Sequence, residues 1–234
     1  MSGVRKFLAR LREDVVALIY PPQCLLCFDV EVSEPVRFLC EPCWLRMQND
    51  FLPAVRDSKL AFCDFDLAAW HYRGAMDVLI PQMKYQNTHP SFAKIFGELA
   101  AQRTHGLLRP YLSARSILVP VPLHPVRERE RGFNQSELIA RSMAAQWGLE
   151  LWPRALRRTR YTQQQAKLSL EDRLRNVEQA FAPRRSVSFE GRAVILVDDV
   201  ITTGATISAC AGVIKEAGAT SVGAIALARG GGAI

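Results

Sequence analysis

The architecture of this 234-residue chain is most readily inferred from one stretch, Val197-Asp198-Asp199-Val200-Ile201-Thr202-Thr203-Gly204-Ala205-Thr206. The apolar residues from Ala193 to Val197 predict a buried strand, and the residues from Ala205 to Ala217 predict a helix that ends at Gly218. A second strand is predicted from Ser221 to Ala228. A strand, a helix and a strand in this order form a βαβ unit, whose two strands are parallel. The sequence therefore predicts an α/β fold.

The same stretch carries groups that suit a sugar phosphate. We expect the strand to end at Asp198 and Asp199, so that both carboxylates lie at the carboxyl edge of the sheet, where open α/β folds bind ligands. Free amides at the start of the helix, threonine hydroxyls and the small Gly204 favour a phosphate there. The carboxylates would repel phosphate, but they can accept hydrogen bonds from ribose hydroxyls or help to hold Mg²⁺. The predicted phosphate-binding residues are Thr202, Thr203, Gly204, Ala205 and Thr206.

Two other interpretations also apply to this stretch. An apolar strand followed by two aspartates also describes a Walker B strand, but the chain contains no G-x-x-x-x-G-K-[ST] motif to grip a nucleoside triphosphate. Alternatively, Asp198 and Asp199 only cap a turn, and the threonines only begin a helix.

Four of the six cysteines form two Cys-x-x-Cys pairs, Cys24 with Cys27 and Cys40 with Cys43. This spacing predicts a structural zinc site of the zinc-ribbon kind, because four thiolates complete a tetrahedron and leave no position for substrate. The alternatives are two disulfides or ordinary apolar cysteines. Cys63 and Cys210 are interpreted as buried hydrophobic residues.

Composition and charge limit the class of protein. The length and the 49% hydrophobic content predict an amino-terminal helix and zinc module over residues 1–58 and a larger domain over residues 59–234. The net charge of +7 favours anionic partners. The apolar residues of the first twenty positions are regularly spaced, and charged residues between them interrupt any signal-peptide core, so we expect a surface helix there rather than a signal peptide. No stretch has the roughly 20 apolar residues of a membrane span, and a soluble, cytoplasmic protein without membrane insertion is expected.

The remaining elements are predicted from apolar periodicity and turn residues. We expect strands over residues 66–72 and 116–122, helices over 74–85, 91–107 and 136–147, and a long mobile loop over 154–175.

The run from Val194 to Thr206 resembles the loop that binds phosphoribosyl diphosphate (PRPP) in the type I phosphoribosyltransferases. Three further segments are similar to the ComF family of competence and DNA-utilisation proteins, namely Val119-Pro120-Val121-Pro122-Leu123-His124-Pro125, Arg131-Gly132-Phe133-Asn134-Gln135-Ser136 and Arg158-Thr159-Arg160-Tyr161-Thr162-Gln163-Gln164-Gln165. The resemblance implies a type I phosphoribosyltransferase-like parallel sheet flanked by helices, PRPP with Mg²⁺ as ligand, and Asp198 and Asp199 as the catalytic acids.

The resemblance also implies a pyrophosphate loop over residues 121–127, a flexible lid over 157–175 and a base-binding hood over about 60–90. Basic side chains that could stabilise the leaving pyrophosphate are Lys84, Arg127, Arg131, Arg158, Arg160 and Lys167. Each of them, taken singly, could equally be a solvated surface charge.

Three functions fit these expectations. The first is an enzyme that transfers phosphoribose from PRPP to an amine acceptor, and the second is a module that senses PRPP or a nucleotide without turnover. The third, implied by the ComF resemblance, is an accessory protein that handles imported single-stranded DNA or contacts the DNA-uptake machinery, with steeply salt-dependent binding.

Overall fold

The computed structural model describes residues 23–29, 32, 38–51, 55–84, 91–160 and 180–230. The chain divides into two compact units, Met1–Asp50 and Phe51–Ile234. The boundary that the sequence places between residues 58 and 59 stays a prediction. In the part of the chain described, no helix is long and apolar enough to cross a membrane.

The larger unit is built on a six-stranded sheet with the order β1-β2-β8-β7-β3-β4. Strand β1 pairs antiparallel with β2, and all other neighbours in this sheet are parallel. The strands are β1 (Arg56–Asp57), β2 (Phe65–His71), β3 (Ser116–Pro120), β4 (Glu150–Leu151), β7 (Ala193–Ile201) and β8 (Ser221–Arg229). A separate antiparallel pair joins β5 (Leu156–Arg158) to β6 (Phe181–Pro183). The predicted α/β class is confirmed.

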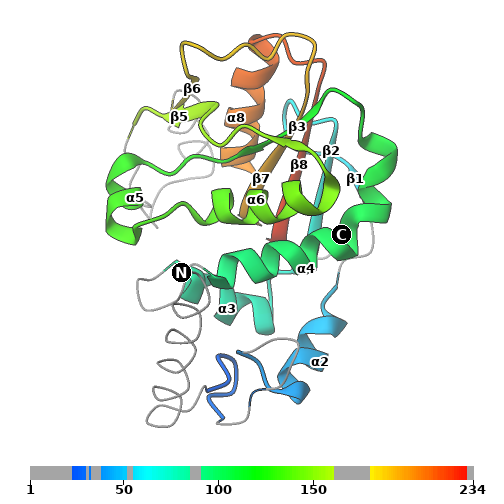
Figure 1. Ribbon diagram of the computed structural model, residues 1–234, viewed down its shortest axis with the longest axis vertical. Coiled ribbons are helices and arrows are strands. Elements are labelled where there is room, and N and C mark those ends of the chain that lie inside the picture. The colour runs from blue at the N-terminus through cyan, green and yellow to red at the C-terminus, as the bar shows by residue number, and fades with distance from the viewer. Residues whose placement is uncertain are drawn as a thin grey trace, which may run out of the picture. The chain divides into compact units, whose positions relative to one another are not determined.

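Helices cover both faces of the sheet because the chain crosses it in both directions (Figure 1). Among the described residues of this unit, the helices are α3 (Ala75–Met83), α4 (Ser91–Leu108), α5 (Pro125–Arg131), α6 (Gln135–Trp147) and α8 (Ala205–Glu216), with a 3-10 turn at Arg109–Tyr111. The connections from β2 to β3 and from β3 to β4 run one way across the sheet, whereas β7 to β8 runs the other way. Right-handed crossovers therefore place α4 and α6 on one face and α8 on the other. Helices α4 and α6 pack side by side, as Figure 1 shows.

The core lies where the central strands meet these helices. Strands β7 and β8 are buried over nearly their whole length, as expected for parallel strands covered on both faces. At the crossing of α4 and α6 the backbones approach so closely that a Cβ added to Gly97 would lie 2.9 Å from the carbonyl oxygen of Ile139. Only glycine fits at that crossing.

Two expectations need correction. Strand β7 does not end at the two aspartates but continues to Ile201, because its pairing with β8 extends to the register Ile201↔Arg229. Part of the region predicted as a mobile loop is strand β5, whose partner β6 comes later in the chain. The predicted amino-terminal helix and residues 161–175 of the predicted lid lie outside the described residues.

Candidate functional site

The order of the strands marks one position on the sheet as the place for a ligand. Strand β3 is followed in the chain by β4 on one side, and its other neighbour, β7, is followed by β8 in the opposite direction. The connections thus diverge between β3 and β7, and a crevice forms beyond the carboxyl ends of these two strands. The loop that follows Pro120 and the residues that follow Val197 both lie at this point.

Two buried acids in β7 occupy this crevice, and each uses its Oδ1 oxygen for internal hydrogen bonds. Oδ1 of Asp198 accepts from the hydroxyl of Ser136 at 2.9 Å and from the backbone N–H of Asp199 at 2.9 Å. Oδ1 of Asp199 accepts from the backbone N–H of Val200 at 2.9 Å. Oδ2 of Asp199 forms an ion pair with Nζ of Lys84 at 2.8 Å. These contacts fix both carboxyl groups before a ligand arrives.

Lys84 and the two acids affect one another through their charges. Burial and the charge of Asp199 raise the pKa of Asp198 to about 7, although the hydrogen bonds from Asp199 and Ser136 and the charge of Lys84 oppose this shift. Burial by itself would lower the pKa of Lys84, but the two carboxylates outweigh it, and the pKa is raised. Lys84 is therefore a firmly charged counter-ion for the acids.

The predicted phosphate-binding residues lie together next to the acids. Thr202, Thr203, Gly204, Ala205 and Thr206 line one pocket with Asp198 and Val200. Gly204 begins helix α8 in the left-handed conformation, with φ of 76°, and it has no side chain to cap the helix. The N–H of Ala205 donates to the hydroxyl of Thr203 at 3.4 Å, but Gly204 offers no side-chain acceptor to the amides of the first turn, an arrangement that suits a phosphate.

The predicted basic residues lie in different surroundings. Lys84 contacts the acids, and Arg131 is near enough to influence the pKa of Lys84. The other four predicted basic residues are Arg127, Arg158, Arg160 and Lys167. The guanidinium of Arg158 lies 5.4 Å from the centre of the Phe181 ring. Burial lowers the pKa of Arg158, while the charges of Cys210 and Asp198 partly oppose this shift. Arg127 forms an exposed ion pair with Glu130, Arg160 is exposed, and Lys167 lies outside the described residues.

Sequence reasoning assigned no role to Ser136, although it hydrogen-bonds to Asp198. A signal was present, because Asn134 is a typical helix N-cap residue and Ser136 falls in the first turn behind it. What could not be foreseen is that α6 begins against β7, since this contact joins residues far apart in the chain.

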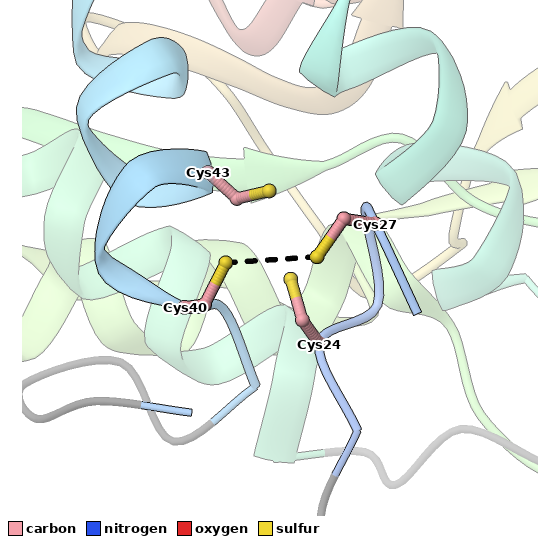
Figure 2. Close-up of side chains that lie close together, drawn as sticks. All are labelled: Cys24, Cys27, Cys40 and Cys43. Atoms are coloured by element: carbon pink, nitrogen blue, oxygen red, sulfur yellow. Dashed lines mark hydrogen bonds between the residues drawn. The ribbon is translucent and has the colours of Figure 1, made fainter. Parts of the chain in front are cut away.

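The four paired cysteines of the amino-terminal unit lie together, and their sulfur atoms point toward one another (Figure 2). All four Sγ atoms are within 4.8 Å of one another, and Sγ of Cys27 lies 3.6 Å from Sγ of Cys40. A disulfide would need about 2 Å, whereas zinc with bonds of about 2.3 Å in a tetrahedron separates its sulfur ligands by about 3.8 Å. Cys40 directly precedes helix α2 (Glu41–Asn49), which carries Cys43. The cluster is compatible with the predicted zinc ribbon.

Backbone amides around the cluster favour a thiolate. Burial would raise the pKa of Cys24, but the N–H groups of Cys27, Cys40 and Leu26 outweigh it and lower the pKa to about 6. Burial and the neighbouring sulfur atoms raise the pKa of Cys43. Because a metal ion requires all its cysteine ligands deprotonated, the ion itself would supply the charge that keeps Cys43 ionised.

Comparison with known proteins agrees with this geometry. Residues 113–233 match the family described as phosphoribosyl transferase domain. The chain is 32% identical over 165 residues to competence protein F of Haemophilus influenzae, a match that covers 68% of this chain and 70% of that protein. It is 32% identical over 207 residues to DNA utilization protein YhgH of Escherichia coli (strain K12), covering 82% of this chain and 84% of that protein.

Among solved structures, a glutamine phosphoribosylpyrophosphate amidotransferase from B. subtilis is 25% identical, with a TM-score of 0.37. That match covers 57% of this chain and 25% of the other, so this chain spans about a quarter of that enzyme's length. The family match and the two relatives show that the chain belongs to the ComF family of proteins with a phosphoribosyl transferase domain.

Proposed function

We propose that this protein binds PRPP in the crevice between β3 and β7. The observation that carries the proposal is the pair of buried acids, Asp198 and Asp199, directly before a pocket at the start of α8, where Gly204 provides no side-chain cap. Carboxylates suit ribose hydroxyls and the amides and hydroxyls at a helix start suit a phosphate, so a ribose 5-phosphate satisfies both halves of the site.

The ion pair of Lys84 bears on the place of Mg²⁺. A metal ion bound to Oδ2 of Asp199 would compete with the ammonium group that lies 2.8 Å from this oxygen. Mg²⁺ therefore fits better as a partner of the ligand's pyrophosphate than as a resident ion, and when bound it would neutralise part of the leaving group's charge. Lys84 and Arg131 then lie where they can add positive charge on the protein's side.

Calorimetric titration with PRPP and Mg²⁺ tests the binding, beside a double variant, Asp198→Asn with Asp199→Asn. We expect binding by the wild type and its loss in the variant. Pyrophosphate release is then measured with a panel of nucleobases and ammonia. Release with one acceptor would establish a phosphoribosyltransferase, and binding without release would favour a sensor. If the wild type does not bind PRPP, the proposal is wrong.

A second candidate function is the handling of single-stranded DNA, and the names of the relatives favour it. Competence protein F and DNA utilization protein YhgH are named for competence and for the utilization of DNA, and the present chain has a net charge of +7. Binding of a fluorescent oligonucleotide should then weaken steeply as salt is raised. Equal binding at 50 and about 300 mM salt, or none at either, would count against this function, for which we propose a cytoplasmic setting.

For the amino-terminal unit we propose a structural Zn²⁺ held by Cys24, Cys27, Cys40 and Cys43. The proposal rests on the mutual distances of the four sulfur atoms and on the amides that favour the Cys24 thiolate. With four protein ligands the ion would have no open position, so its contribution is to folding rather than to chemistry.

A further inference from the structure

Three consecutive polar residues at the start of α6 are buried, which is unusual for a helix start. Asn134, Gln135 and Ser136 are 8%, 3% and 1% exposed. Polar side chains are costly to bury unless each finds a hydrogen-bond partner. Their partners therefore indicate what this segment does.

Asn134 joins the start of α6 to the loop that follows β3. Its Nδ2 donates to the carbonyl oxygen of Val121 at 3.0 Å, and its Oδ1 accepts from the N–H of Ser136 at 3.1 Å. The backbone N–H of Val121 in turn donates to the carbonyl oxygen of Val197, so this loop is tied to β7 as well. One side chain thus caps the helix and holds one wall of the crevice.

Ser136 joins the same helix start to the other wall. Its hydroxyl donates to Oδ1 of Asp198, the oxygen that also accepts from the N–H of Asp199. Two donors on Oδ1 restrain the rotation of the carboxyl group of Asp198. The hydroxyl is not required for helix capping, because Asn134 already performs that function.

We propose that Ser136 is a positioning residue for Asp198, and that the segment Asn134–Ser136 sets the spacing of the two loops that form the PRPP site. This inference rests on the proposed function, since it assigns a role toward the ligand bound by Asp198. A hydrogen bond to a charged group contributes enough to binding geometry that losing it should weaken PRPP binding by roughly 10- to 100-fold.

A double-mutant cycle on PRPP affinity tests the role, with Ser136→Ala, Asp198→Ala and the two combined, titrated with PRPP and Mg²⁺ at one pH and salt. We expect Ser136→Ala alone to raise Kd by roughly 10- to 100-fold, and by less than about threefold in the Asp198→Ala background. The matched control is Ser142→Ala, a second buried serine on the same helix, which should leave Kd unchanged. Thermal unfolding of each variant shows that it is folded.

Ser136→Cys, which fills the site with a slightly larger side chain but donates only a weak hydrogen bond, replaces Ser136→Ala if that variant does not fold. An unchanged Kd in the serine variant, or an equal loss in both backgrounds, would overturn the positioning role while PRPP binding by the wild type stands. If the wild type does not bind PRPP, the proposed function fails and the positioning role fails with it.

Discussion

Burial and the carboxylate of Asp199 raise the pKa of Asp198 to about 7, far above its ordinary value of 3.8. The folded state therefore prefers the protonated form of Asp198 more than the unfolded state does. The resulting contribution to stability is fully present below about pH 4 and is lost as the pH rises toward 7. At neutral pH the ionised, buried Asp198 therefore lowers the stability of the ligand-free protein.

Asp198→Asn should remove this cost. In Mg²⁺-free buffer at pH 8 we expect the variant to be more stable than the wild type by about 2 to 4 kcal/mol, with no such gain at pH 4. Thermal unfolding from pH 4 to 8.5 measures the difference. Asp64→Asn, at an exposed ion pair, is the control. Parallel curves for wild type and Asp198→Asn would contradict the expectation.

Lys84, whose partner Asp199 is buried, should matter more than Lys215, a lysine of similar exposure whose partner Asp64 is half exposed. Lys84→Met leaves Asp199 without its counter-ion, and we expect a loss of about 2 kcal/mol at pH 8 and weaker PRPP binding. Lys215→Met breaks the exposed pair with Asp64, whose N–O distance is 3.0 Å, and should cost less than about 1 kcal/mol. Urea unfolding measures both, and equal losses would show that burial does not strengthen the Lys84 pair.

The chemistry of the site could be predicted residue by residue where one short stretch contains it. Asp198 and Thr202 to Thr206 are neighbours in the sequence, and they line one pocket in the structure. Ser136 acts on Asp198 across 62 residues, and no local pattern records such a contact. The hydrogen-bond partner of a buried acid becomes visible only when the helix that carries it is placed against the sheet.

Among the elements, prediction succeeded where apolar residues are continuous and failed where pairing is distant. Strand β8 and helix α8 agree with their predicted limits to within one residue at each end, since a buried run and Gly218 mark them. Strand β5 was missed because its sequence is polar, and it is held by β6 beyond a long connection. The continuation of β7 through two aspartates was missed for a similar reason, as β8 supplies the pairing.

Helix α4 contains two glycines that should respond oppositely to alanine. Gly97→Ala places a Cβ 2.9 Å from the backbone oxygen of Ile139, so α4 and α6 must separate, at a cost of about 1 to 3 kcal/mol. A Cβ at Gly106 meets no atom within 4 Å, and Gly106→Ala should stabilise the helix by about 0.5 to 1 kcal/mol. Chemical denaturation of both variants decides this. A stabilised Gly97→Ala would mean that the crossing is looser than described.

In the whole molecule, the four clustered cysteines belong to the smaller unit, and the two cysteines of the larger unit serve as an internal control for thiol reactivity. Removal of zinc by a chelator should make Cys24, Cys27, Cys40 and Cys43 reactive toward a thiol reagent in the native protein. Cys63 and Cys210 should stay slow, because burial raises the pKa of both thiols. Metal analysis should give one zinc per chain before chelation. Four reactive thiols in untreated, freshly purified protein would argue against a bound metal.

The central position of β8 has a consequence for how the protein is made. This strand comes last among the described elements, yet it lies between β2 and β7 and joins them into one sheet. A ribosome delivers the acids and the phosphate loop before it delivers Ser221–Arg229. The nascent chain therefore cannot complete the sheet until Ser221–Arg229 has been made, and a product truncated before Ser221 keeps every predicted contact residue but lacks the strand that joins β2 to β7.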